Sequence, residues 1–150
     1  MKKTLKLTLA LALVLSTVLA LLSCSLMEKM PWNKSDEPSY DTETKVYTSD
    51  TTLGEGAKTL TVRIEDNEKS VTFTIHTNAE TVGSALLENG LISGEAGAYG
   101  LYIKVANGTV ADYDIDGSYW AFYVDGEYAM SGVDTTDIKE GVTYSLVYTK

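Results

Sequence analysis

Hydrophobic and polar residues alternate along the chain from Thr59 onward. Leu60, Val62 and Ile64 are separated by polar residues, and the alternation returns over 71–75 after the polar run 66–69. Successive side chains of a strand point to opposite faces of the sheet, so a period of two predicts a strand with one buried face. The pattern therefore predicts a β-hairpin over 59–75.

The apolar spacing becomes helical at Thr81, where Val82, Ala85 and Leu86 fall on one helix face and Gly90 suits a left-handed C-terminal cap. A short helix is therefore expected over 81–89. Alternating runs predict the remaining strands at 101–105, 119–124, 127–130 and 142–149, with an Asp-Gly turn at 125–126. Together these elements predict an α+β domain over 58–150, with five to six mostly antiparallel strands and one short helix.

The preceding segment has a different composition. Residues 25–57 are rich in Lys, Asp, Glu, Ser and Thr, contain both prolines and show no apolar periodicity. Such a sequence buries too little apolar surface to offset the entropy lost on ordering, so a flexible polar tether is predicted over 24–57. Its aromatic residues Trp32, Tyr40 and Tyr47 are expected to dock loosely or not at all, the alternative being a short recognition element.

Residues 1–23 have the layout of a secretion signal, with three lysines, an apolar run over 7–22 and small residues at the end. The alternative is an uncleaved transmembrane anchor, because about 17 apolar residues can span a bilayer as a helix. The one cysteine favours the signal. Residues 21–24 (LLSC) resemble the lipobox of bacterial lipoproteins, and this resemblance implies lipidation of Cys24, a free thiol being the alternative. An extracytoplasmic protein, lipid-anchored to the cell membrane, is expected.

The charge and the residue types exclude several classes of function. Removing residues 1–23 leaves 9 basic and 21 acidic residues, a formal net charge of −12, which makes nucleic acid a poor partner. A single histidine supports neither a catalytic triad nor a multi-histidine metal site. The carboxylates crowd on turns, where their pKa values are expected to be ordinary, so no catalytic residue and no enzymatic activity are predicted.

Residues 112–117 (DYDIDG) reproduce the first half of a calcium loop, in which alternate carboxylates converge on the cation. The twelfth position, which should supply a bidentate glutamate, is Tyr123. A solvated, Asp-rich turn is therefore expected here and no metal site is predicted, with a calcium site as the alternative.

Six short segments carry a family resemblance: 81–91 (TVGSALLENGL), 99–103 (YGLYI), 105–108 (VANG), 117–122 (GSYWAF), 132–134 (GVD) and 139–144 (KEGVTY). In this order they resemble, over roughly 59–149, the transcobalamin-like C-terminal domain family, the small domain of vitamin B12 carriers and of many bacterial surface lipoproteins. The resemblance implies a β-grasp-like fold and a soluble ligand, cobalamin or another corrinoid. In the carriers a larger helical domain completes the ligand site, and no such partner domain is found in this chain.

Two arguments select candidate ligand-binding residues. In the predicted strands, alternation turns Tyr102, Tyr119 and Tyr123 outward, and with Tyr99 they form a tyrosine cluster suited to recognition. Ordinary half-buried sheet positions are the alternative interpretation of these tyrosines. The family resemblance adds Ser118 and Trp120, although alternation places Trp120 in the core.

The leading functional hypothesis is a surface lipoprotein that captures or presents a soluble ligand, with a membrane transporter or a surface protein as partner and with no cofactor of its own. The alternative is a protein-interaction or adhesion module. A concave aromatic site would favour a small ligand, and a flat patch or an exposed edge strand would favour a protein.

Overall fold

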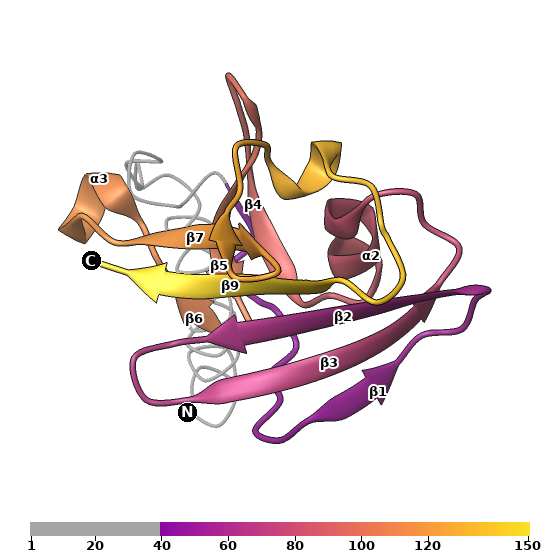
Figure 1. The fold of residues 1–150 in the computed structure, drawn as a ribbon. Coiled ribbons are helices and arrows are strands. Elements are labelled where there is room, and N and C mark those ends of the chain that lie inside the picture. The colour runs from indigo at the N-terminus through magenta and orange to yellow at the C-terminus, as the bar shows by residue number, and fades with distance from the viewer. Residues whose placement is uncertain (1–39) are drawn as a thin grey trace, which may run out of the picture. The chain divides into compact units, whose positions relative to one another are not determined.

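The structure, a computed structural model, describes residues 40–150, which form two β-sheets and a few short helices (Figure 1). The larger sheet has six strands in the order β1-β3-β2-β9-β7-β8. Their bounds are Thr51–Leu53 for β1, Lys58–Glu65 for β2, Ser70–Thr77 for β3, Tyr119–Val124 for β7, Glu127–Tyr128 for β8 and Thr143–Thr149 for β9. The smaller sheet has the order β4-β5-β6, with bounds Ile92–Gly97, Gly100–Ala106 and Thr109–Val110.

The predicted hairpin over 59–75 is confirmed as β2 and β3. The two strands pair antiparallel with Leu60 opposite Ile75 and Val62 opposite Phe73, and these four side chains are fully buried. On its other side β2 pairs in parallel with β9, which in turn pairs antiparallel with β7. The alternating apolar positions of the hairpin thus face the centre of the domain, as period two requires.

The predicted helix is also confirmed, as α2 (Val82–Glu88). Thr81 caps its N-terminus by accepting a hydrogen bond from the backbone N–H of Ser84 at 3.3 Å. Gly90 follows the helix with φ +69°, a left-handed conformation that glycine adopts without steric cost. A second helix, α3 (Tyr113–Asp116), and a 3-10 turn, η2 (Val133–Thr135), are single turns.

The predicted fold class is wrong. Residues 40–150 form nine strands in two sheets, not one β-grasp-like sheet of five to six strands. The segment 92–97 (ISGEAG) was not predicted as a strand because its glycines and alanine interrupt the alternation; it pairs with β5 through an irregularity between Ser93 and Gly94. Because β5 pairs with β4 and β6, the strand predicted at 101–105 belongs to a separate sheet.

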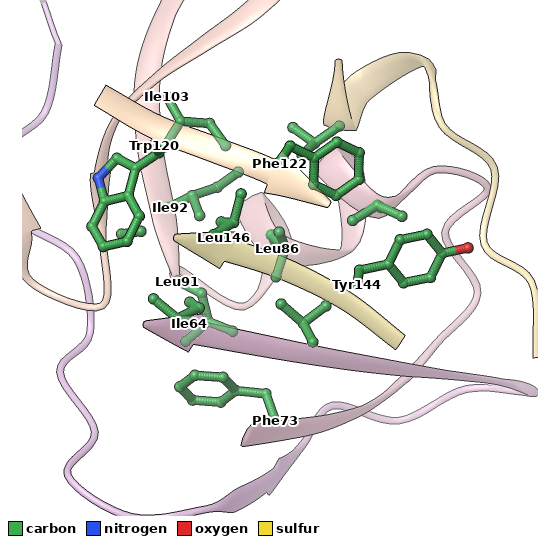
Figure 2. Close-up of a cluster of buried hydrophobic side chains, with 14 of the residues drawn as sticks. Ile64, Phe73, Leu86, Leu91, Ile92, Ile103, Trp120, Phe122, Tyr144 and Leu146 are labelled. Carbon is green, nitrogen blue, oxygen red and sulfur yellow. The ribbon is translucent and has the colours of Figure 1, made fainter. Parts of the chain in front are cut away.

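The core lies between the six-stranded sheet, the smaller sheet and α2, all of which contribute to one cluster of buried side chains (Figure 2). Leu60, Phe73 and Leu146 come from the larger sheet, Leu86 from α2, and Ile103 from the smaller one. Trp120 lies at one margin of this cluster (Figure 2). The buried members of the cluster belong to residues 60–146, and partly buried side chains that include Tyr47, Leu53 and Tyr148 pack against them.

Residues 40–57 lie against the domain, which differs from the behaviour expected of a flexible tether. The ring of Tyr47 packs edge-on against Phe73, with ring centroids 5.5 Å apart, and its backbone N–H donates to Asn107 at 2.7 Å. Strand β1 then adds to the edge of the larger sheet, parallel to β3. A few specific contacts therefore hold this polar segment, although it has no apolar periodicity of its own. We refer to residues 40–50 as the strap.

The predicted signal over 1–23, Cys24 and the first part of the predicted tether lie outside the described residues. Within residues 40–150, every helix is too short or too polar to cross a bilayer.

Candidate functional site

Aromatic side chains from three segments surround a pocket of about 440 Å³. The segments are the hairpin β4–β5, strand β7, and the stretch from β8 to η2. Figure 1 shows the tip of the hairpin next to the loop that carries η2, beyond the edge of the larger sheet. The lining residues are Gly97, Ala98, Tyr99, Gly100, Leu101, Tyr102, Ile103, Tyr119, Trp120, Phe122, Tyr128, Ala129, Ser131, Gly132 and Val133.

Six of these lining residues are aromatic and none is charged. A concave, mostly apolar site of a few hundred Å³ with a small number of polar groups is typical of small-molecule binding. The geometry thus matches the concave aromatic site that favours a small ligand over a flat protein contact.

Two tight turns bring these segments together. The β4–β5 turn contains Gly100, whose φ of +107° is rarely adopted by residues with a side chain, and it carries Tyr99, which is 94% exposed. The predicted Asp-Gly turn at 125–126 is confirmed, with both residues at positive φ, and it returns the chain from β7 into β8. Tyr128 on β8 therefore lies beside the end of β7.

Trp120 belongs both to the core and to the pocket wall. Its side chain is part of the buried cluster and only 7% exposed, and it also lines the pocket. Its ring packs edge-on against Tyr148 at 5.8 Å between centroids. The two placements inferred from the sequence, core and ligand side, are therefore compatible.

The indole N–H of Trp120 is buried and has no hydrogen-bond partner among residues 40–150. Buried polar groups are nearly always hydrogen-bonded, so an unpartnered donor in a pocket wall requires an explanation.

The structure brings four of the six predicted ligand-binding residues together in this lining: Tyr99, Tyr102, Tyr119 and Trp120. The other two lie elsewhere. Ser118 is 1% exposed, accepts a hydrogen bond from the backbone N–H of Asp112 and donates to Asp116, which makes it part of the α3 turn. Tyr123 packs edge-on against Tyr128 at 5.5 Å on β8, outside the lining.

A buried ion pair adjoins the pocket behind Tyr102. Nζ of Lys104, a residue only 2% exposed, lies 2.8 Å from Oδ1 of Asp112 and 3.4 Å from Oε1 of Glu95. The ammonium group also lies 4.6 Å from the ring centroid of Tyr102 and 5.7 Å from that of Tyr40. The Tyr40 hydroxyl donates to Oδ2 of Asp112 at 3.1 Å, which ties the strap to the same network.

This network shifts the pKa values of its members. The hydrogen bond from Lys104 lowers the pKa of Asp112; burial opposes this effect, and hydrogen bonds from the N–H of Asp114 and from Tyr40 reinforce it. Burial disfavours the charged form of Lys104, but the hydrogen bonds and charges of Asp112 and Glu95 raise its pKa. Both groups are therefore charged at neutral pH.

The pKa values of the two neighbouring tyrosines rise as well. For Tyr102, burial raises the pKa and the charge of Lys104 opposes the shift. For Tyr40, burial and the hydrogen bond to Asp112 both raise it. Neither phenol ionises near neutral pH, so the Lys104 ammonium group lies over two uncharged tyrosine rings.

The solvated turn expected over 112–117 is wrong for Asp112, which is 9% exposed. The carboxylate of Asp112 binds Lys104, and the carboxylate of Asp116 binds Lys150 at 2.9 Å. These carboxylates, which a calcium ion would need as ligands, are therefore bound to ammonium groups. Within residues 40–150, no three side chains of His, Cys, Asp or Glu lie close enough together to hold a metal ion.

Sequence reasoning missed much of the lining. Phe122 was expected in the core, and its burial confirms this, but it also lines the pocket. Tyr128 and the segment 129–133 also line the pocket and were not identified from the sequence. An exposed tyrosine after an Asp-Gly turn was the one available signal for Tyr128. Residues 129–133 and the β4–β5 turn are far apart in the sequence, so a local pattern does not predict that they lie close together.

Comparison with known proteins gives a partial match. Residues 79–149, slightly less than half of the chain, match a family described as a domain of unknown function (DUF4430). No curated protein matches the chain.

Solved structures of similar fold include a candidate metal-binding protein from Ruminococcus gnavus. It is 27% identical to this chain with a TM-score of 0.59, and the match covers 63% of this chain and 98% of that one. Haptocorrin in complex with Cbi matches at 20% identity with a TM-score of 0.48, over 62% of this chain and 25% of haptocorrin. The chain thus spans nearly all of the first protein and about a quarter of the second.

Proposed function

We propose that the domain binds a small organic ligand in the aromatic pocket between β5, β7 and the loop before η2. The observation that carries this proposal is the convergence of six aromatic side chains on one apolar hollow of about 440 Å³. Aromatic rings supply large contact area at low entropic cost, and a few polar groups then fix the orientation of the ligand.

The setting of this binding is part of the proposal. Cleavage before Cys24 and lipidation of its thiol would hold the domain outside the cytoplasm, where it captures a ligand and presents it to a membrane transporter or a surface protein. The sequence of residues 1–24 supports this placement. Intact-mass measurement of the native protein tests it: an amino terminus at Met1 with a bare thiol would exclude lipidation.

A corrinoid is the specific ligand to test first, because the sequence resembles the transcobalamin-like family. A corrinoid is larger than this pocket, so only part of it would enter, and a second polypeptide would be needed to enclose the rest. We therefore expect weak binding by this chain alone.

The test is a nuclear magnetic resonance titration of ¹⁵N-labelled residues 25–150, which contain the complete core. Adamantanol serves as a compact apolar probe and cobalamin as the specific one. Saturable shifts are expected for backbone amides of 97–103, 119–122 and 128–133, and not for the distant hairpin β2–β3. Absence of saturable shifts with both probes, in a folded protein, would exclude the proposed function.

An exposed apolar rim favours a second candidate function, a protein-interaction module. Around the pocket mouth Tyr99 is 94% exposed and Tyr128 59% exposed, and Met130, next to lining residue Ala129, is 98% exposed. Contiguous exposed apolar residues often mark contact surfaces. If Met130→Ser leaves adamantanol binding intact but abolishes association with a surface partner, the rim serves that second function.

A further inference from the structure

A carboxylate without a partner lies directly behind the pocket wall. Oδ1 of Asp134, in the η2 turn next to lining residue Val133, is buried and has no hydrogen-bond partner among residues 40–150. An unpaired buried carboxylate oxygen is costly, because it loses water and gains no donor in return. Asp134 as a whole is half-buried, and a cation beside it would reduce this cost.

Two glycines of the pocket lining lie against the carboxylate of Asp134, which is not itself a lining residue. A Cβ atom on Gly100 would lie 2.5 Å from Oδ1 and 2.7 Å from Oδ2 of Asp134, and one on Gly132 would lie 2.8 Å from Oδ1. The carboxylate thus occupies the space that side chains at both positions would fill, and it packs against the bare backbone. A side chain at either glycine would displace this carboxylate.

The pocket itself supplies no positive charge. None of its lining residues is Lys, Arg or His. The ammonium group of Lys104, beside lining residue Tyr102, is already paired with Asp112 and Glu95. The charge of Asp134 therefore acts on the pocket without a protein cation to balance it.

The aromatic lining also favours a positively charged ligand. The faces of Trp and Tyr rings attract cations, and aromatic pockets are used to recognise alkylated ammonium groups. A carboxylate close to such a lining adds Coulombic attraction for the same cation.

We propose that the ligand is an organic cation, an ammonium group on an apolar body, whose charge is balanced by Asp134. This inference rests on the proposed ligand-binding function and names the chemical class of the ligand. A bare metal ion does not fit the same place, because Asp134 is a single carboxylate and hard cations need several oxygen ligands.

Two probes of the same shape test the inference: adamantylamine, which is an ammonium ion at neutral pH, and adamantanol, which is neutral. The protein is residues 25–150 with Trp32→Phe, so that Trp120 is the only remaining tryptophan. Its fluorescence then reports occupancy of the pocket. At low ionic strength the amine should bind about tenfold more tightly than the alcohol, and added salt should reduce the difference.

The variant Asp134→Asn should abolish the preference for the amine and leave binding of the alcohol unchanged. Asp137→Asn is the matched control, because it makes the same change of charge at an exposed position three residues away. This control should keep the preference. Circular dichroism checks that both variants fold, and the comparison of the two probes on the parent protein needs no variant at Asp134.

The outcomes separate the two proposals. If both probes bind with equal affinity, the cationic ligand is excluded and the binding function stands. If neither binds a folded protein at millimolar concentration, the binding function itself is excluded. A preference that survives Asp134→Asn, or disappears in Asp137→Asn, would exclude Asp134 as its source.

Discussion

Lys104 and Asp112 form an ion pair inside the domain, with 2.8 Å between Nζ and Oδ1 and with side chains 2% and 11% exposed. Replacing Lys104 by Met would leave the Asp112 carboxylate buried without its cation. We expect this variant to lose about 3–5 kcal/mol of unfolding free energy, towards the lower end because Tyr40 and the Asp114 N–H still donate to Asp112. Urea denaturation measures the loss.

Lys150→Met is the matched control for that prediction. Lys150 also binds an aspartate, Asp116, at 2.9 Å, but the two side chains are 59% and 38% exposed. Water solvates both charges when the pair is broken, so no measurable change in stability is expected. Equal effects of the two substitutions would show that burial does not determine the contribution of Lys104.

The same carboxylates predict how stability depends on pH. The pKa of Asp112 is below its ordinary value of 3.8, and hydrogen bonds from Ser118 and Lys150 lower that of Asp116 to about 2. A group whose pKa is lower in the folded state stabilises the fold above its unfolded pKa, and this contribution is lost as the pH falls through the folded pKa. Unfolding free energy should therefore decrease from about pH 4 down to about pH 2.

Denaturation at several pH values tests this dependence, and Asp112→Asn should flatten part of the decrease. Lys104 acts in the opposite range: its raised pKa stabilises the fold below the ordinary value of 10.5, and this contribution is lost as the pH rises through the folded value. Both groups therefore contribute fully near neutral pH. If the decrease in unfolding free energy at acid pH is the same in Asp112→Asn, other carboxylates cause it.

Tyr47 should matter for stability, although it lies in a segment of polar composition. Its ring packs on Phe73, so Tyr47→Ala should cost roughly 1–3 kcal/mol in thermal or urea unfolding. Tyr47→Phe retains the ring and should behave like the parent within ~0.5 kcal/mol. If the alanine variant is equally stable, the strap does not contribute to the folded state in solution.

Gly100→Ala should disturb the pocket more than the same change at Gly117. Both glycines have positive φ, so each alanine pays roughly 1–2 kcal/mol of backbone strain. At Gly117 the added methyl group meets nothing within 4 Å, whereas at Gly100 it meets the Asp134 carboxylate. Unfolding measurements should therefore rank Gly100→Ala as the less stable variant, and it should also lose adamantylamine binding.

Local patterns predicted five of the six strands of the larger sheet, whereas β1 fell within the predicted tether. The strand over 119–124 was predicted with its observed bounds, and Thr81 and Gly90 marked the ends of the helix, because caps and alternation are encoded in neighbouring residues. Strand β4 was missed, since its two glycines and its exposed end leave no alternation to detect. Without β4 the second sheet could not be predicted, and the fold class was wrong for that reason.

The candidate site was only partly predictable. Tyrosines at 99, 102 and 119 stood out by residue type, but the loop over 129–133 reaches them only through tertiary packing. Lys104 could not be identified as buried, because alternation placed it on the same outward face as Tyr102 and its carboxylate partner lies eight residues away. Burial of a charge depends on its partner, which a periodic pattern does not reveal.

The strap enters the domain close to the pocket. Tyr40 is bonded to Asp112, Asp112 holds Lys104, and Lys104 rests on the ring of Tyr102, which belongs to the pocket wall. Tension applied to the chain before Tyr40 would therefore reach the pocket wall through three side chains. In the anchored, ligand-binding protein that we propose, force on the anchor would act on the side chains that support the pocket wall.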